Sequence, residues 1–206
     1  MNHVITIGRE FGSGGREFGR RLAEALHMDY YDREIITEIS QRTQLAEEYV
    51  QLVVERKPHK LYPITIGRSI QPISMPVLQT DQSIYIEQSR IIKEMADKSS
   101  CVIVGRCADE ILKEYQPVRI FVYADIESRI KRCQFQCEQE ETYSDKDLRQ
   151  KIMEIDKKRS KYYEFYTGKK WGDRRNYDFC INTGRLDIKS FVPQFAKLIG
   201  SELKQI

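Results

Sequence analysis

The segment that decides the fold is Val4–Ala23, which reads VITIGREFGSGGREFGRRLA. The apolar run Val4–Ile7 does not alternate with polar residues and predicts a buried strand, and the residues from Arg16 onward predict an amphipathic helix. Between them stand four glycines within the eight residues Gly8–Gly15. Glycines let several backbone N–H groups converge on one point, and the start of the next helix adds partial positive charge. The turn is therefore predicted to hold a phosphate group, the alternative being a tight strand-to-helix turn without a ligand.

This glycine-rich turn departs from the Walker A pattern, in which a lysine and a Ser or Thr follow the last glycine. Aligned through the helix without a gap, Gly15 takes the lysine position and Arg16 the Ser/Thr position, and Arg9 replaces the first glycine. The lysine that contacts the outer phosphates and the hydroxyl that ligates Mg²⁺ are therefore both absent. Arg9 or Arg16 would have to supply the missing cation, with a planar fork in place of a point charge.

Other short apolar runs predict the rest of a parallel sheet covered on both faces. Helical patterns separate these runs, which is typical of an α/β protein. The predicted strands are 4–7, 101–104, 120–123 and 179–181, with a weaker one at 29–31. The predicted helices are 16–26, 33–42, 45–56, 80–98, 125–139 and 144–166, the last capped by Ser144.

Composition narrows the function classes. The chain has 206 residues, which suits one α/β domain, and its net charge of +3 is too small to indicate a nucleic-acid polymer as partner. It contains neither an apolar stretch long enough to span a membrane nor a signal peptide, so we expect no membrane partner and a cytoplasmic location. The five cysteines are interpreted as reduced thiols. Cys133 and Cys137 would either bind a metal or pack in the core, and the lack of a nearby His favours the core.

Two further features leave alternatives open. Residues 57–80 are rich in Pro and Gly and predict a long loop, which either folds over a substrate or is a mere excursion. In the helix 144–166, Arg159 falls within the apolar stripe, where a guanidinium needs an anion. That anion is either a carboxylate of a neighbouring helix or a phosphate, and the glycine-rich turn favours a phosphate.

The sequence resembles the cytidylate-kinase-like proteins of bacteria, relatives of the nucleoside monophosphate kinases. The resemblance implies a doubly wound, five-stranded parallel P-loop fold in one kinase-like domain, 1–206. Its core would be 1–32, 99–128 and 176–206, with an acceptor-binding insertion at about 33–98 and a helical lid at about 129–175. The segments that carry the resemblance are ITIGREFGSGGREFGRRLA at 5–23, YYDREII at 30–36, VIVGRCADEIL at 102–112, RIFVYADIESRIKR at 119–132, DKKRSKYYEFYTGKKWGD at 156–173 and YDFCINTG at 177–184.

The residues and the resemblance together predict roles for single residues. ATP would be the donor, with Mg²⁺ held mostly through waters that Asp32 and Glu17 orient, and with no direct protein ligand. The predicted donor-binding residues are Arg9, Gly12, Ser13, Gly14, Gly15, Arg16 and Glu17. The predicted acceptor-binding residues are Asp32, Arg106 and Asp109, and the predicted catalytic residues are Arg16, Arg129, Arg132 and Arg159.

The predicted activity is ATP-dependent phosphoryl transfer to a small acceptor, most simply a nucleoside monophosphate such as CMP or dCMP. The sequence departs from true cytidylate kinases at Cys107, where they carry Asp, and at Asn182, where they carry Asp as well. The alternatives are a nucleotide-binding sensor without catalysis, a kinase of a non-nucleotide metabolite, and a structural partner with an empty turn. Small nucleotides are the expected partners, and a homo-oligomer is compatible with the sequence.

Some of these residues also have simpler interpretations. Arg106 would alternatively cap a helix or pair with Asp109. Arg129 and Arg132 would alternatively be solvated surface charges, which is the usual state of Arg on a helix. Trp171 would seal an edge of the core.

Overall fold

The computed structural model describes residues 2–55, 76–137 and 144–203. Its centre is a five-stranded sheet in the order β2-β3-β1-β4-β5, in which every neighbouring pair is parallel. This confirms the predicted fold class. The strands are β1 (Val4–Arg9), β2 (Asp29–Tyr31), β3 (Cys101–Val104), β4 (Val118–Tyr123) and β5 (Phe179–Asn182).

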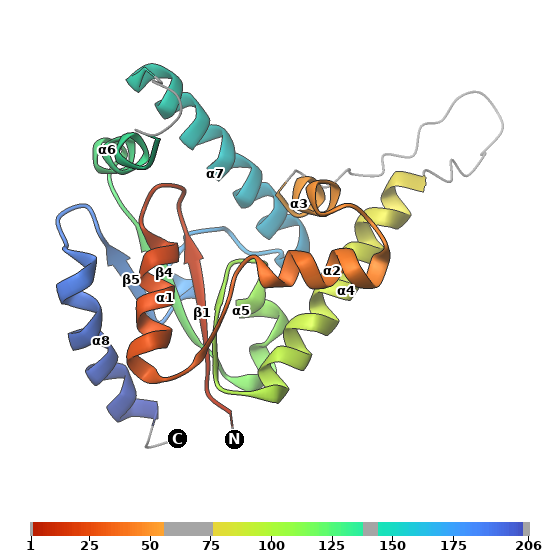
Figure 1. The fold of residues 1–206 in the computed structure, drawn as a ribbon, viewed down its shortest axis with the longest axis horizontal. Coiled ribbons are helices and arrows are strands. Elements are labelled where there is room, and N and C mark those ends of the chain that lie inside the picture. Colours follow the sequence, from red (N-terminus) through yellow and green to blue (C-terminus); the bar gives the residue numbers. More distant parts are fainter. Residues whose placement is uncertain (1, 56–75, 138–143, 204–206) are drawn as a thin grey trace.

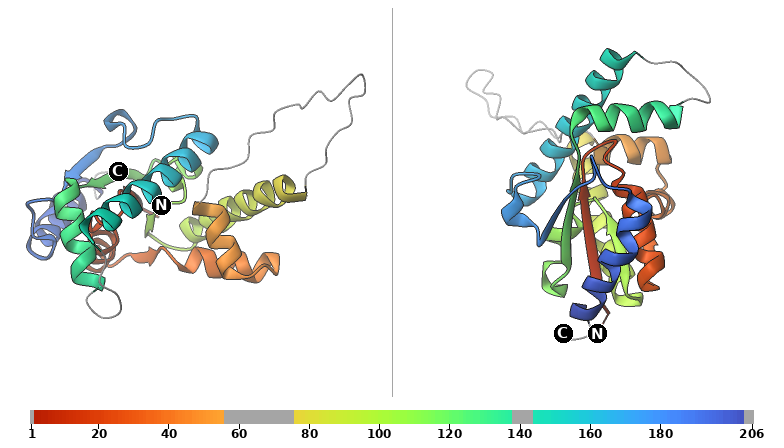
Figure 2. Two further views of the ribbon diagram at one scale, coloured as in Figure 1. Left: turned by 90° about the horizontal axis from the view of Figure 1, so that it is seen from above. Right: turned by 90° about the vertical axis from the view of Figure 1, so that its left-hand side faces the viewer.

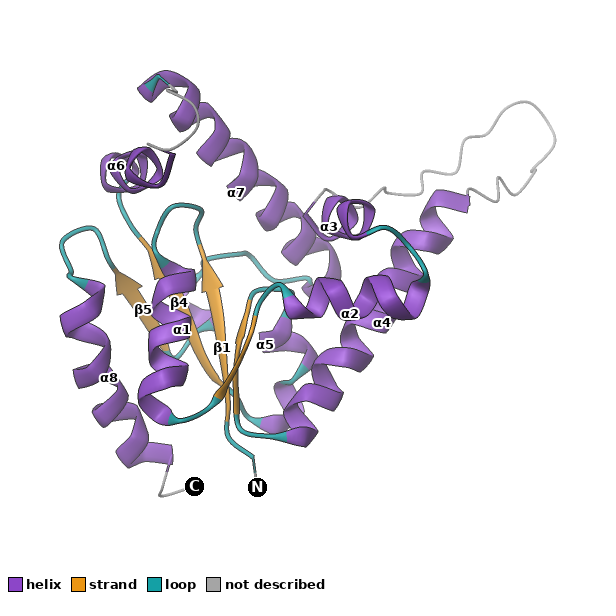
Figure 3. Ribbon diagram, viewed as in Figure 1, coloured by secondary structure: helices purple, strands orange, loops and turns teal. Residues whose placement is uncertain are grey.

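Helices cover both faces of the sheet (Figures 1 and 3). On one face, Ile5 and Ile7 of β1 pack with α1 (Gly15–Leu26) and α8 (Ile188–Leu203). On the other, Val4 packs with the group formed by α2 (Glu34–Thr43), α3 (Glu47–Glu55), α4 (Pro76–Lys98) and the short α5 (Ala108–Ile111). Because both faces are buried, the strands need apolar residues at consecutive positions, which is why their sequence pattern does not alternate.

Two long helices lie over the carboxyl ends of the strands, α6 (Ile126–Cys137) and α7 (Asp145–Thr167) (Figures 1 and 2). The Ser144 hydroxyl accepts a hydrogen bond of 3.2 Å from the Asp147 N–H, which confirms the predicted cap of α7. The start of β1 and the last turn of α8 lie at the opposite end of the sheet (Figure 1). The carboxyl edge is where ligands of open parallel sheets bind. The division into core, insertion and lid stays a prediction.

Some sequence predictions need correction. Residues 76–80, expected as loop, belong to α4, because a proline is well tolerated in the first turn of a helix. The rest of the predicted loop, 57–75, lies outside the described residues. The sequence analysis also did not predict α8, whose interior contains Pro193. It did not predict α5 or the 3₁₀ turns η1 (Lys113–Tyr115) and η2 (Arg174–Asn176), which are too short to show a period.

The remaining composition-based expectations concern cysteines and membranes. Cys133 is buried against Leu148 and Ile152, as the core interpretation predicts, whereas the side chain of Cys137 lies outside the described part. Cys180 is exposed. Among the described helices, none is long and apolar enough to cross a membrane.

Candidate functional site

The glycine-rich turn after β1 takes a conformation that requires its glycines. Gly12 and Gly14 have φ angles of +74° and +78°, in the left-handed region. A Cβ at Gly12 would lie 3.1 Å from the Arg129 carbonyl oxygen, and one at Gly14 would lie 2.5 Å from Ile188 Cδ1. The Ser13 hydroxyl donates to the Glu10 carbonyl at 2.8 Å, so this predicted donor-binding side chain closes the turn itself. The turn therefore presents backbone to a ligand.

A cavity of about 600 Å³, which we call the loop cavity, opens over this turn. Its volume is in the range of sites for small ligands, about 300–1,000 Å³. Six basic and two acidic side chains stand among the described residues that line it, so it favours an anion. The basic ones are Arg9, Arg16, Lys131, Arg132, Arg159 and Lys189, and the acidic ones are Glu10 and Glu17.

Arg16 and Asp32, two predicted site residues, are paired with each other. The Arg16 Nε lies 2.7 Å from the Asp32 Oδ2, and the Arg16 side chain is 45% exposed. Asp32 is buried and is not among the described residues that line the loop cavity. Glu17 does line that cavity, while accepting a hydrogen bond of 2.8 Å from Arg21. Of the two acids expected near Mg²⁺, Glu17 is thus the one that faces the loop cavity.

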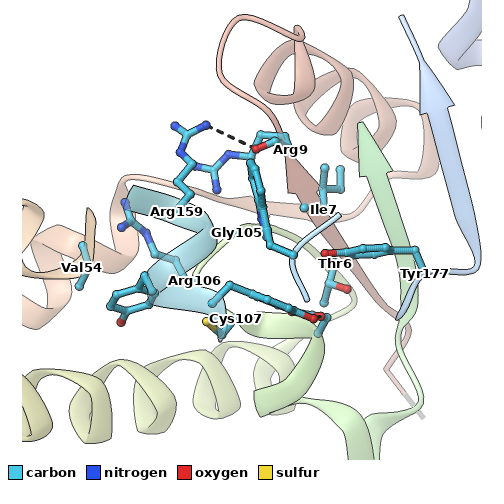
Figure 4. A pocket seen from close by; sticks show the side chains of 14 residues that line it. Thr6, Ile7, Arg9, Val54, Gly105, Arg106, Cys107, Arg159 and Tyr177 are labelled. Carbon is cyan, nitrogen blue, oxygen red and sulfur yellow. Dashed lines mark hydrogen bonds between the residues drawn. The ribbon is translucent and has the colours of Figure 1, made fainter. Parts of the chain in front are cut away.

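A second cavity of about 50 Å³, which we call the arginine cavity, lies between the carboxyl ends of β1 and β3 and helix α7 (Figure 4). The side chains of Arg9, Arg106 and Arg159 line it, and Figure 4 shows them gathered on one side. The Arg159 Nη1 donates to the Arg9 carbonyl at 3.4 Å, and its guanidinium lies 5.5 Å from the centroid of the Phe11 ring. The aromatic residues of this cavity are Tyr162, Tyr163, Trp171 and Tyr177.

Arg106 reaches the arginine cavity through an unusual turn. Gly105, Arg106 and Cys107 follow one another with φ angles of +75°, +61° and +54°. Left-handed conformations cost free energy for residues with a Cβ, so surrounding contacts must hold them. One such contact is Gln88 of α4, fully buried, whose Nε2 donates to the Arg106 carbonyl at 3.0 Å. The sequence analysis did not identify Gln88, because a single Gln within a helix carries no local signal.

Asp109 and Trp171 also border the arginine cavity. The Asp109 Oδ2 accepts a hydrogen bond of 2.6 Å from the Tyr163 hydroxyl, and burial raises the pKa of the Asp109 carboxyl. The Trp171 ring stands edge-on to Phe121 of β4, at 5.4 Å between centroids, so it packs on the core and faces the cavity at once. Asp109 thus lines the same cavity as Arg106, and its predicted acceptor-binding role stays a prediction.

Arg129 and Arg132, both predicted as catalytic, have different surroundings. The buried Arg129 bonds Glu10 at 3.1 Å, the Phe11 carbonyl at 2.7 Å and the carboxylate of Asp156. It is not one of the described residues that line either cavity, and this placement favours a structural role, joining the glycine-rich turn to α6 and α7. Arg132 lines the loop cavity and donates to the Thr183 hydroxyl at 3.2 Å, and burial lowers the pKa of its guanidinium. Its predicted role stays a prediction.

Known proteins that resemble this chain identify its family. The model of the cytidylate kinase-like family matches residues 4–185. A cytidylate kinase of Staphylothermus marinus is 25% identical over 201 residues, which cover 94% of this chain and 98% of the relative.

Solved structures share the fold of this chain. An uncharacterized protein from Eubacterium ventriosum is 30% identical, with a TM-score of 0.70, covering 97% of this chain and 99% of the other. A shikimate kinase from Bacteroides thetaiotaomicron, 16% identical with a TM-score of 0.56 over 96% of this chain and 98% of its own, shares the fold. Since the family match includes all five strands and the glycine-rich turn, this chain belongs to the cytidylate kinase-like family.

Proposed function

We propose that this protein transfers the terminal phosphoryl group of ATP to a nucleoside monophosphate, with CMP or dCMP as the first candidates. The observation that carries the proposal is that Arg9 and Arg159 line both cavities. A donor held on the glycine-rich turn and an acceptor phosphate held in the arginine cavity would meet beside these two guanidinium groups. Phosphoryl transfer requires such in-line placement together with positive charge around the moving group.

The residues of the loop cavity fit the phosphates of a nucleoside triphosphate. The turn at Gly12–Gly15 and the start of α1 provide N–H groups and partial positive charge. Lys131 and Lys189 add charge at the rim of the cavity. When Mg²⁺ is bound with the donor, it neutralises part of the phosphate charge. The described residues contain no cluster of three or more His, Cys, Asp or Glu side chains, so Glu17 would act on that ion through water.

The arginine cavity fits the phosphate of the acceptor. Its volume of about 50 Å³ suits a group the size of a phosphate rather than a whole nucleoside, which would extend out of the cavity. Arg106 and Arg159 would orient this phosphate. One of its oxygens attacks the terminal phosphorus of the donor, and the bond from that phosphorus to the bridging oxygen breaks. The electron pair stays on the departing diphosphate, so no general base is needed.

The name of the Staphylothermus relative supports a cytidine nucleotide as acceptor. The test is a coupled assay of ADP release with ATP and a panel that contains CMP, dCMP, UMP, AMP, GMP and several phosphate-free metabolites. We expect turnover with a pyrimidine monophosphate, and a rise of at least about 10-fold in the acceptor KM when Arg106→Gln removes the charge.

Two results would contradict the proposed function. ATP binding by calorimetry without product from any acceptor would favour a sensor. Transfer confined to a phosphate-free acceptor would make the protein a metabolite kinase.

A further inference from the structure

The side chain of Arg9 occupies the space that a lysine at position 15 would need. A Cβ added to Gly15 would lie 2.5 Å from the Arg9 Cβ and 3.0 Å from its Cγ. Real Cβ atoms do not approach other carbons so closely. Gly15 stands where the Walker A motif has its lysine, and Arg9 stands where that motif has its first glycine. The two departures from the motif are therefore sterically linked, since a side chain at position 9 excludes one at position 15.

The guanidinium of Arg9 continues from this point into the region between the cavities. Its Nη1 would be 1.8 Å from a Cβ at Gly105, so it lies against the turn that presents Arg106. Arg9 is only 8% exposed, and its Nε has no hydrogen-bond partner among the described residues. Arg9 lines both the loop cavity and the arginine cavity. A buried cationic side chain that borders two cavities is placed to meet an anion from either.

The charges around Arg9 also favour an additional anion. Burial lowers the pKa of Arg9, and the nearby guanidinium groups of Arg159, Arg106 and Arg16 lower it further. Asp32 opposes this effect, but its Oδ1 is 3.7 Å from the Arg9 Nη2, whereas its Oδ2 is 2.7 Å from Arg16. Asp32 is thus mainly engaged by Arg16. A phosphoryl group beside Arg9 would supply the negative charge that its surroundings lack.

We propose that Arg9 and Gly15 form an exchanged Walker A pair, in which Arg9 is the catalytic cation that contacts the phosphoryl group in transit. This inference deepens the proposed function and rests on it. The fixed fork of Arg9 stabilises the charge on the equatorial oxygens without having to reorganise. Arg16, with its half-exposed side chain held by Asp32, serves the donor at the cavity surface instead.

The experiment swaps the residues at positions 9 and 15 to match the Walker A motif. It also compares removal of the Arg9 charge with removal of the Arg16 charge in the same turn. The variants are Arg9→Gln, Arg9→Gly, Gly15→Lys, the double variant Arg9→Gly/Gly15→Lys, and Arg16→Gln. Arg9→Gln is expected to lower kcat by at least about 100-fold, whereas Arg16→Gln mainly raises the donor KM, by about 3- to 10-fold. Gly15→Lys alone is expected to lose activity because the lysine collides with Arg9. The double variant is expected to recover at least about 10-fold in kcat over Arg9→Gly.

Two kinetic results would overturn the exchange, provided that melting temperatures show folded protein. One is a kcat for Arg9→Gln within about threefold of that for Arg16→Gln. The other is a double variant no more active than Arg9→Gly. Where Arg9→Gln does not fold, the comparison of the double variant with Arg9→Gly decides alone.

A binding readout separates this inference from the proposed function. If the wild type transfers phosphate to no acceptor, the proposed function fails, and calorimetry with ATP and ADP then tests Arg9 alone. Arg9→Gln is expected to lower the ratio of ATP affinity to ADP affinity by about 10-fold, because Arg9 contacts the terminal phosphate. An equal ratio in Arg9→Gln and the wild type would reject a role for Arg9 at that phosphate.

Discussion

The loop cavity and the arginine cavity both suit phosphate groups, but they are built in different ways. The loop cavity, of about 600 Å³, is formed by the consecutive backbone of residues 12–17 with basic side chains around its opening. The arginine cavity, of about 50 Å³, is formed by side chains from distant parts of the chain: the buried Arg9 at the end of β1, the buried Arg106 after β3 and the half-buried Arg159 in α7.

This difference predicts unequal tolerance to substitution. Backbone N–H groups keep their direction when a surrounding side chain changes, and solvated charges at a rim contribute little each. Buried guanidinium groups that fit against one another depend on the shape of every neighbour, because interiors are close-packed. Substitutions around the arginine cavity should therefore strongly impair acceptor binding and phosphoryl transfer. Substitutions around the rim of the loop cavity should weaken donor binding only slightly.

The largest effect is expected for Gly105→Ala. The new Cβ would lie 1.8 Å from the Arg9 Nη1, so Arg9 must leave its place. We expect kcat to fall by at least about 100-fold, since misplacing a catalytic group by about 1 Å has this effect. The free energy of unfolding should fall by about 1–2 kcal/mol for the left-handed φ of +75° and by about 1–3 kcal/mol more for the collision. Kinetics and urea unfolding measure the two quantities.

Gly168→Ala is the matched control, because Gly168 has a similar φ of +68° but no atom within 4 Å of its added Cβ. It should show the conformational cost alone, about 1–2 kcal/mol, with kcat unchanged. Equal losses of stability and activity in both variants would mean that Arg9 tolerates displacement, and the close fit of the arginine cavity would be refuted.

The second prediction concerns Gln88→Met, which keeps the shape of the side chain but removes its hydrogen bonds. The Arg106 carbonyl loses the donor at 3.0 Å, and the Tyr162 hydroxyl loses its acceptor at 3.5 Å. The turn at Arg106 should then relax, raising the acceptor KM by about 10-fold while the donor KM changes by less than about twofold. Steady-state kinetics with each substrate varied in turn gives both constants.

Ser89→Ala serves as the control in the same helix. Its hydroxyl donates to the Tyr85 carbonyl at 2.8 Å, away from Arg106, and both KM values should stay at the wild-type level. If Gln88→Met raised both KM values equally, Gln88 would only stabilise the fold. The claim that acceptor binding depends on the packing around the arginine cavity would then fail at this residue.

The same contrast explains how much of the structure the sequence predicted. The five strands and the glycine-rich turn were predicted because their signals are local: consecutive apolar residues, and glycines placed between a strand and a helix. The C-terminal helix α8 was missed because Pro193 breaks its pattern, although there the proline lies on an exposed face. The part of the loop cavity that the turn itself forms follows from contiguous residues, whereas Lys131, Arg132 and Lys189 reach it through tertiary packing.

The arginine cavity could be anticipated only in part. The place of Arg159 on an apolar stripe predicted that it meets an anion; the structure places its guanidinium beside the Arg9 carbonyl, and the anion stays a prediction. Nothing in the sequence shows that Gly15 and Gly105 are glycines because the Arg9 side chain fills the space beside each. The same holds for Asp156, which binds Arg129 and also accepts a hydrogen bond from the N–H of Phe11, 145 residues earlier in the chain. Such contacts depend on tertiary packing, which no local pattern records.

A smaller effect is predicted at the rim of the loop cavity, for Lys189→Gln at the start of α8. Lys189 is exposed and lines the cavity, so it attracts the donor through solvent. We expect the donor KM to rise by about 2- to 5-fold at low salt and the difference to shrink as salt screens the charge. Lys197→Gln, an exposed lysine further along α8, should leave the KM unchanged. A rise in the donor KM of more than about 50-fold for Lys189→Gln would show that the rim is as sensitive to substitution as the arginine cavity.

The smallest predicted effect is a pH dependence of stability at Asp109, beside the arginine cavity. Burial raises the pKa of this carboxyl above its ordinary value of 3.8, so the folded protein binds the proton more tightly than the unfolded chain. The stabilisation that Asp109 contributes is therefore complete below its unfolded pKa and is lost as pH rises through the folded pKa. The free energy of unfolding of the wild type, measured in urea, should thus fall relative to that of Asp109→Asn as pH rises from 3.8.

Asp173→Asn serves as a comparison in which the pH dependence of stability has the opposite sign. Hydrogen bonds from Arg175 hold the pKa of the half-buried Asp173 below its ordinary value, so its contribution to stability is present at neutral pH and is lost as pH falls through the folded pKa. The Asp109 difference from the wild type should therefore change above pH 3.8 and the Asp173 difference below it, in opposite directions as pH rises. Parallel changes would mean that the carboxyl of Asp109 is solvated in the folded protein, and that the wall of the arginine cavity beside it is open to water rather than closed by packed side chains.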